Sequence, residues 1–234
     1  SSGTLAAGDY LKEKLSTKIA VVEASECPTL LNNGYGEHNI QGIGDKHVPL
    51  IHNVMNTDFV VGISDKSTDN LNIVFNTKIG HRFLEGRKGL NSDLIKKLPE
   101  FGFSTIANIL ASIKLAKYLK LGSEDAVITV ATDGADLYLS ELNKAQKNFK
   151  GPFDETACAE IFGQHLKGLS TDNLLELSQM DKERIFNLGY YTWVEQQGVK
   201  VDDFEARRTK EFWDKHYCEM ISLDTKIKEF NELQ

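Results

Sequence analysis

Two spacings of apolar positions recur along the chain, and each predicts a different kind of element. Short runs of apolar, β-branched residues predict buried strands, at positions 18–23, 59–63 and 126–130. Apolar residues at every third or fourth position predict helices, at positions 4–14, from 65 to about 84, and 104–119. Because strands and helices alternate, we expect an α/β fold with a largely parallel sheet and flanking helices.

Other segments lack a clear period. Residues 32–44 are polar and rich in glycine, which predicts a loop with several tight turns, and residues 85–99 form a second polar stretch. A short helical piece is expected near residues 48–54. In the first helix, one stripe holds the apolar side chains Leu5, Tyr10, Leu11 and Leu15.

The pattern changes after residue 150, where Gly151 and Pro152 mark a break. No strand-like run follows, and residues 173–188 and 202–233 predict helices. We therefore expect residues 1–150 to form the α/β region and residues 151–234 to form a helical extension.

Composition narrows the class of protein. The 234 residues are 41% hydrophobic and 26% charged, with a net charge of −7, which suits a globular core and argues against a nucleic-acid surface. No apolar run is long enough to cross a membrane. Three widely spaced cysteines (Cys27, Cys158 and Cys218) follow no CxxC pattern, which favours reduced thiols in a cytoplasmic protein.

The first candidate site is the start of the first helix, at Ser1, Ser2, Gly3 and Thr4. Backbone N–H groups at a helix start, with hydroxyls beside them and a glycine that permits close approach, can bind a phosphate. An ordinary helix cap, with the leading Ser-Ser-Gly a tag remnant, explains the same residues equally well. No dinucleotide or P-loop fingerprint occurs.

The second candidate is the glycine-rich stretch Gly34 to Gly44 (GYGEHNIQGIG). A loop with this much glycine approaches another group closely or moves. His38 is a candidate base or metal ligand, but no second ligand stands at metal-binding spacing, so a solvated histidine is favoured and no metal site is expected.

The third candidate is Ser104, near the start of the most strongly patterned helix. A serine there usually caps the helix by accepting a backbone N–H. The alternative is that its hydroxyl faces a cofactor at the ends of the strands. On the local pattern alone, the cap is the favoured interpretation.

Four segments resemble segments of cysteine synthases and cystathionine β-synthases, which are pyridoxal-phosphate enzymes of fold type II. They follow one another along the chain in the same order as in that family. The segment GEHNIQGIG resembles their HKIQGIG motif, and SSGTLAAGDYLKEK resembles their phosphate loop and its helix. The segment GFSTIANILASIKLAKYL resembles their GISSGAAVAAA helix, and AVITVATDGADLYLSE resembles their last strand and PDSGxxYLS turn. The resemblance covers roughly residues 1–142.

The resemblance implies a cofactor, pyridoxal 5′-phosphate, and roles at the matching positions. Ser1, Ser2, Gly3 and Thr4 would hold the cofactor phosphate, and Ser104 would face the pyridine nitrogen. Gln41, Gly42 and Gly44 would form a loop on the substrate side. A neutral hydroxyl at the ring nitrogen suits elimination and replacement at the β-carbon of an amino acid more than transamination.

Several departures qualify the resemblance. The first glycine of the phosphate loop is absent, Ser2 replaces its second glycine, and Asp45-Lys46 replaces the small residues that usually follow QGIG. The turn after the third predicted strand is one residue longer than in the family. The family's Schiff-base lysine lies upstream of the phosphate loop, and Lys12, Lys14 and Lys18 are poor substitutes because they lie on or beside a surface helix.

We therefore expect a fragment of a pyridoxal-phosphate lyase or transferase, inactive without its N-terminal half, and homodimeric as family members commonly are. The tail from Lys167 to Val199 resembles a longer branch that includes the β subunit of 2-amino-4-oxopentanoate thiolase, which acts in ornithine breakdown with a small α subunit. Exposed aromatics at Tyr190, Tyr191 and Trp193 would then form a docking patch or pack on the parent domain. The competing hypotheses are a non-catalytic binding module of this fold and, less favoured, a nucleotide-binding α/β domain.

Overall fold

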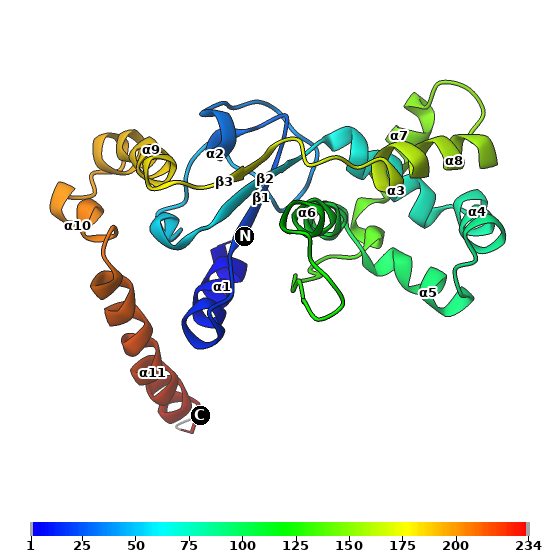
Figure 1. Cartoon of the computed structure of the whole chain (residues 1–234). Helices are drawn as coiled ribbons and strands as arrows, with labels where there is room; N and C mark the ends of the chain where they lie inside the picture. The colour runs from blue at the N-terminus through cyan, green and yellow to red at the C-terminus, as the bar shows by residue number, and fades with distance from the viewer. Residues whose placement is uncertain (1, 233–234) are drawn as a thin grey trace. The chain divides into compact units, whose positions relative to one another are not determined.

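A computed structural model describes residues 2–232 of the chain (Figure 1). By their internal contacts these residues form two compact units. Unit 1 contains Ala20–Lys46 and Phe59–Glu176. Unit 2 contains Ser2–Ile19, His47–Asp58 and the chain from Leu177 onward. The units group segments by contacts in space, so the predicted division of the chain at residue 150 stays a prediction.

Unit 1 is built around a sheet of three strands, β1 (Ala20–Ala24), β2 (Phe59–Ile63) and β3 (Leu174–Glu176), in the order β1-β2-β3. Strands β1 and β2 are parallel, with Ala20 opposite Phe59. Strands β2 and β3 are antiparallel, with Phe59 opposite Glu176. The α/β class and the first two predicted strands are confirmed. The sheet is mixed, however, and β3 lies where no strand was expected.

The third predicted strand, at residues 126–130, is wrong. The segment is irregular, and Val127, Ile128 and Val130 are 45%, 72% and 44% exposed. Among the described residues, no backbone group of positions 126–131 forms a backbone hydrogen bond. The β-branched pattern favours an extended chain, but a strand also needs a neighbouring strand to pair with. This segment has none in the described part of the chain.

Strand β2 is buried on both faces, and its alternate residues meet different helices. Phe59, Val61 and Ile63 belong to the main apolar core with α6 (Phe103–Leu119), and the Phe59 ring meets Tyr118 of that helix edge-on. On the other face, a Cβ added to Gly62 would lie 2.9 Å from Leu31 of α2 (Thr29–Asn32). Glycine therefore allows α2 to pack directly on the strand.

The helix predicted from residue 65 to about 84 is two helices, α3 (Asp65–Asn76) and α4 (Lys78–Lys88). Thr77 ends the first helix in an extended conformation, and its hydroxyl caps the second by accepting from the Gly80 N–H. A Cβ added to Gly80 would lie 1.9 Å from the Val74 carbonyl oxygen, so this corner requires glycine.

The remaining helices of unit 1 surround this frame. They are α5 (Ser92–Lys97), α7 (Leu139–Asn148), α8 (Glu155–Phe162), the short 3₁₀ turns Leu98–Glu100 and Ala135–Tyr138, and a π-helical turn at Gly163–Lys167. The expected polar stretch at residues 85–99 is therefore mostly helical. Asn91 explains the start of α5, because its side chain accepts hydrogen bonds from two backbone N–H groups of the first turn.

A buried lysine connects α6 to the end of the sheet. Lys114 is 3% exposed, and its ammonium group donates to the Gly62 carbonyl and to the carbonyl and carboxylate of Asp172, at 2.7 to 3.1 Å. The Gly62 N–H in turn donates to the Asn173 carbonyl at 2.7 Å. The lysine thus holds the segment that leads into β3 against β2.

Unit 2 is mostly helical. It contains α1 (Ser2–Leu15), the 3₁₀ turn η1 (Val54–Asn56), α9 (Gln179–Tyr190), a π-helical turn at Tyr191–Gln196, α10 (Val201–Ala206) and α11 (Lys210–Glu232). Helix α1 was predicted from the sequence. The predicted helix at 173–188 begins later, because Ser178 and Asp181 form a capping box at the start of α9. The predicted helix at 202–233 is interrupted between α10 and α11.

Apolar and aromatic side chains form the interior of unit 2. Ile185, Phe186 and Phe204 are almost fully buried. The guanidinium of Arg207, which is 4% exposed, lies 5.2 Å and 5.1 Å from the ring centres of Phe186 and Phe204. Burial lowers the pKa of Arg207 to about 10. Its Nε and one terminal nitrogen have no hydrogen-bond partner among the described residues, so the aromatic faces are its main compensation.

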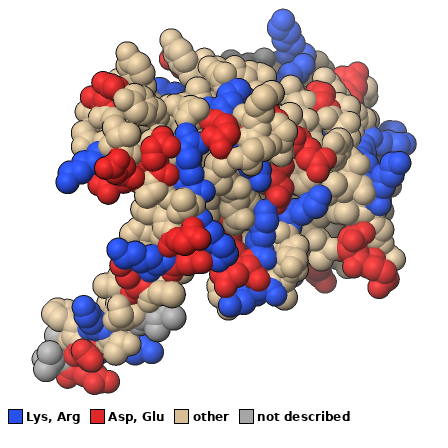
Figure 2. Space-filling view, turned by 60° about the vertical axis from the view of Figure 1, so that its left-hand side comes forward, with Lys and Arg blue, Asp and Glu red and all other residues tan. Residues whose placement is uncertain are grey.

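Charge distribution, helix hydrophobicity and the thiols describe the general character of the chain. On the face in Figure 2, acidic and basic side chains alternate over short distances. In the described part of the chain, no helix combines the length and the apolar character that crossing a membrane requires. Cys27 and Cys158 are buried thiols and Cys218 is an exposed one.

The buried His52 of unit 2 predicts a loss of stability in acid. Burial, and then the charge of Arg207, lower its pKa from 6.5 to about 4, and its Nε2 lies 2.9 Å from the Thr57 hydroxyl. The unfolded chain takes up this proton near pH 6.5 and the folded chain only near 4. The free energy of unfolding should therefore fall by up to about 3 kcal/mol as the pH drops through that window.

Urea unfolding at several pH values between 4 and 7.5, compared with His52→Gln, measures this effect. Glutamine keeps a partner for Thr57 but does not titrate, so the variant should lose part of the pH dependence. Equal slopes for the two proteins would contradict the assignment.

Candidate functional site

Ser104 lies at the start of α6 but does not cap the helix. Gly102 occupies the N-cap position, without a side-chain cap. The Ser104 side chain is buried, at 6% exposure, and its hydroxyl lies 3.1 Å from the hydroxyl of Thr132. The favoured interpretation from the local pattern, an N-cap, is therefore wrong. Two hydroxyls from segments 28 residues apart form a pair instead.

The glycine-rich loop reaches the same point. Gly42 has a left-handed backbone, with φ of +83°, and a Cβ added to it would lie 3.7 Å from Ser104 Cβ and 3.8 Å from its Oγ. The structure therefore brings two of the predicted positions, Gly42 and Ser104, into contact. Thr132, which was not predicted as a site residue, joins them through its contact with Ser104.

Hydrogen bonds to Asp133 hold the chain next to this hydroxyl pair. The Gly102 N–H donates to the Asp133 carbonyl at 2.7 Å, and the Tyr138 hydroxyl donates to the Asp133 carboxylate at 2.7 Å. Burial, together with Asp133, raises the pKa of Tyr138 to about 12, so Tyr138 remains a hydrogen-bond donor at neutral pH. The Thr105 hydroxyl is buried and has no partner among the described residues.

The loop that carries Gly42 is fixed by the start of α3. The N–H groups of Asn39 and Ile40 donate to the Asp65 carboxylate at 2.7 and 3.2 Å. Ile40 is fully buried. The predicted loop residue Gln41 is exposed, so it is free to face a bound molecule or solvent.

His38 packs on the second glycine of the predicted motif. Gly44 has φ of +80°, and a Cβ there would lie 3.0 Å from His38 Nε2. The other ring nitrogen, Nδ1, is buried and has no hydrogen-bond partner in the described part of the chain. The glycine thus makes room for the imidazole ring.

The described residues of the predicted phosphate loop belong to unit 2 and not to unit 1. Ser1 is outside the described residues, and Ser2, Gly3 and Thr4 form the first turn of α1. These residues belong to unit 2, whereas Gly42 and Ser104 belong to unit 1. The predicted pocket that these two groups would share stays a prediction.

Of the three lysines weighed as substitutes for the Schiff-base lysine, one forms an ion pair in a partly buried position and two are exposed. Lys12 forms an ion pair with Asp58 at 2.7 Å, Lys14 is 54% exposed beside Glu13, and Lys18 is exposed. Lys182, which the sequence analysis missed, donates to the Met55 carbonyl at 3.0 Å, and burial lowers its pKa.

A separate polar pocket of about 200 Å³ lies in unit 1, at the carboxyl ends of β1 and β2. Within it, His165 Nδ1 lies 2.9 Å from the Ser67 hydroxyl, and its Nε2 lies 3.2 Å from the Asn70 side chain. Burial, and then Lys66, lower the pKa of His165. Both ring nitrogens of His165 therefore have partners within unit 1. Among the described residues, no cluster of His, Cys, Asp and Glu could hold a metal ion.

Comparison with known proteins finds a partial similarity to a cysteine synthase. The chain is 31% identical, over 142 residues, to cysteine synthase B of Campylobacter jejuni subsp. jejuni serotype O:2. The similarity covers 60% of this chain but only 40% of that protein, so the chain spans well under half of its length. No protein-family model and no solved structure matches the chain. The chain is thus similar to a cysteine synthase over part of both sequences.

The two loop glycines predict a graded effect of substitution. Both Gly42→Ala and Gly44→Ala should destabilise unit 1 by about 1–2 kcal/mol, because alanine resists a left-handed backbone. Gly44→Ala should cost roughly 1 kcal/mol more, because its Cβ forces the His38 ring to move.

Urea unfolding of both variants, repeated in a His38→Ala background, separates the two effects. Removing the ring should abolish the extra cost at Gly44 and leave the cost at Gly42 unchanged. A difference that survives without the ring would disprove the contact.

Proposed function

We propose that this chain is the part of a pyridoxal-phosphate-dependent enzyme of the cysteine-synthase type that contacts the cofactor phosphate and ring. The observation that carries the proposal is the meeting of Gly42, Ser104 and Thr132. The similarity to cysteine synthase B supports it. The chain spans only part of that relative, so the activity of the whole protein belongs to the proposal.

The residues fit such a cofactor in two respects. Two neutral hydroxyls, of Ser104 and Thr132, share one hydrogen bond, and the neighbouring buried hydroxyl of Thr105 has no partner among the described residues. Glycine at position 42 leaves one side of the pair without a side chain. A flat heteroaromatic ring with an acceptor nitrogen suits this arrangement.

When bound, pyridoxal phosphate supplies an electron sink for chemistry at the α- and β-carbons of an amino acid. Ser104 and Thr132 would hold the ring nitrogen by a neutral hydrogen bond, which keeps the nitrogen largely unprotonated. Ser2, Gly3 and Thr4, at the start of α1, and Ser1, which is outside the described residues, would hold the phosphate through backbone N–H groups and hydroxyls. Gln41, Gly42 and Gly44 would face the substrate.

The reaction class follows from this neutral contact. We assign elimination or replacement at the β-carbon, because a weaker electron sink disfavours transamination. Thiolytic cleavage of a carbon–carbon bond, as by the β subunit of 2-amino-4-oxopentanoate thiolase, is the narrower alternative. A homodimer, or a small α subunit as partner, belongs to the same proposal.

We further propose that a segment outside residues 1–234 carries the Schiff-base lysine. Within unit 1, residues 126–131 have the composition of a strand but no backbone partner among the described residues. This segment directly precedes Thr132. A strand from the lysine-bearing part of the protein would pair with it and place its own residues next to the hydroxyl pair.

The test uses the full-length protein that contains this chain, loaded with pyridoxal phosphate. Borohydride reduction followed by peptide mapping should identify a modified lysine outside residues 1–234. Hydrogen exchange at residues 126–131 should be slow in the full-length protein and fast in residues 1–234 alone. Trapping of the cofactor on Lys182, or on any other lysine of this chain, would overturn the proposed division.

Substitution of the hydroxyls tests the ring contact. Ser104→Ala and Thr132→Val should each keep the fold, weaken pyridoxal-phosphate affinity roughly threefold to tenfold and shift its absorbance band, because one hydrogen bond is lost. Ser112→Ala is the matched control, since that hydroxyl lies on the same helix and donates to the Asn108 carbonyl, within the helix itself. If affinity, spectrum and turnover stay unchanged in both variants, these residues do not contact the cofactor. A protein that binds partners but no cofactor would favour the non-catalytic module.

A further inference from the structure

Polar contacts attach helix α1 to the rest of unit 2. Among the residues of α1 whose burial the structure describes, only Asp9 is buried, at 8% exposure. Two members of the predicted apolar stripe, Tyr10 and Leu15, are 60% and 67% exposed. The usual attachment of a helix through an apolar face is therefore weak here. Loss of a polar contact should have an unusually large effect on the position of this helix.

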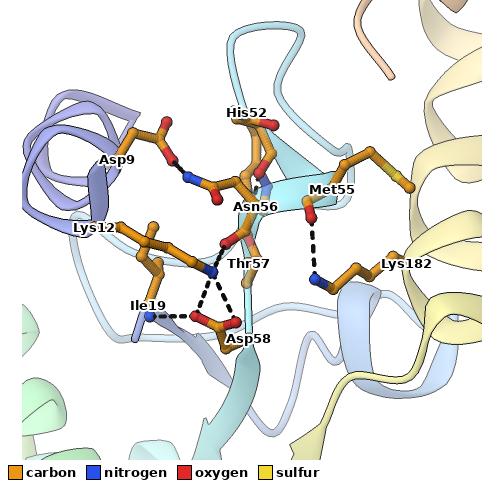
Figure 3. Close-up of polar contacts among 10 residues, drawn as sticks. Asp9, Lys12, Ile19, His52, Met55, Asn56, Thr57, Asp58 and Lys182 are labelled. Carbon is orange, nitrogen blue, oxygen red and sulfur yellow. Dashed lines mark hydrogen bonds and ion pairs between the residues drawn. The ribbon is translucent and has the colours of Figure 1, made fainter. Parts of the chain in front are cut away.

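The carboxylate of Asp9 is held from two directions. The Asn56 side chain donates to its Oδ1 at 2.5 Å, as Figure 3 shows. The Tyr217 hydroxyl, from the C-terminal helix α11, donates to its Oδ2 at 2.9 Å. Asp9 and Tyr217 are 208 residues apart in the sequence. The hydrogen bond thus ties the two ends of the chain together within unit 2.

A second polar contact holds α1 one turn after Asp9, at Lys12. The Lys12 ammonium group lies 2.7 Å from both carboxylate oxygens of Asp58 and donates to the Asn56 carbonyl at 2.7 Å (Figure 3). Asp58 also accepts from the Ile19 N–H at 2.8 Å, which fixes the chain just after the helix. With Lys12 held in this way, Asp9 is the next anchor toward the helix start. Asp9 is five residues from Thr4, about 7.5 Å along the axis.

We infer that Tyr217 is a positioning residue for the phosphate end of α1, acting through its hydrogen bond to Asp9. The inference rests on the proposed function, because that function assigns the phosphate to Ser1, Ser2, Gly3 and Thr4. The C-terminal helix thereby takes part in cofactor binding without touching the cofactor. It does so by holding the helix whose first N–H groups receive the phosphate.

The substitution Tyr217→Phe removes this one hydroxyl and keeps the ring. In the full-length protein, we expect affinity for pyridoxal phosphate to fall about tenfold, as for a lost hydrogen bond to a charged group. Affinity for pyridoxal, which lacks the phosphate, should be unchanged. The ³¹P resonance of the bound cofactor should broaden or shift, and hydrogen exchange of the α1 amides should accelerate.

Tyr191→Phe is the matched control, because Tyr191 also lies in unit 2 but its side chain is 72% exposed. Asp9→Ala, which removes the carboxylate that accepts from the Tyr217 hydroxyl, should reproduce the effect of Tyr217→Phe. Faster exchange in α1 with unchanged pyridoxal-phosphate affinity would overturn the inference and leave the tie purely structural. Equal losses for pyridoxal and its phosphate would overturn it as well.

The same measurements separate this inference from the proposed function. A wild-type protein that takes up no pyridoxal phosphate would refute the proposed function, and with it the role assigned to Tyr217. A wild-type protein that binds the cofactor normally, with an unaffected Tyr217→Phe variant, would refute the inference alone.

Discussion

Hydrogen bonding by the backbone of β2 is the constraint on which the rest of unit 1 depends. The strand is buried along its whole length, so each of its N–H and C=O groups needs a partner inside the protein. Strand β1 supplies one edge and β3 the other. The Lys114 ammonium adds a bond to the last part of the strand. Residues 174–176, well beyond the Gly151-Pro152 break, therefore complete the central sheet and are more than a peripheral addition to it.

Elements whose identity depends on local pattern were predictable from the sequence, and those that depend on a distant partner were not. Strand β2 and helix α6 have strong local signals, and the structure has both. Residues 126–130 carry the same β-branched signal as β2, but no neighbour in the described part of the chain pairs with them. Residues 174–176 carry little signal, yet they form a strand because β2 offers a free edge. Pairing decides the outcome in both cases.

The residues of the candidate site also divide into those that the sequence indicated and those that it did not. Ser104 and Gly42 were found through the order and spacing of motifs, and the structure brings them into contact. Thr132 was missed because its contact with Ser104 spans 28 positions and has no local signature. Asp9 was missed for a different reason. A carboxylate in a helical sequence normally marks the face of the helix that meets solvent. Asp9 is buried instead, because side chains from two distant segments donate hydrogen bonds to it.

The exposed β-branched segment at residues 126–131 also affects how this polypeptide behaves in isolation. Its backbone donors and acceptors have no backbone partner among the described residues and lie beside apolar side chains. Such a segment can pair edge to edge with another extended chain. Two copies of the polypeptide present that segment to each other. Association of copies should therefore rise steeply with concentration, and a charged side chain in place of Ile128 would oppose it.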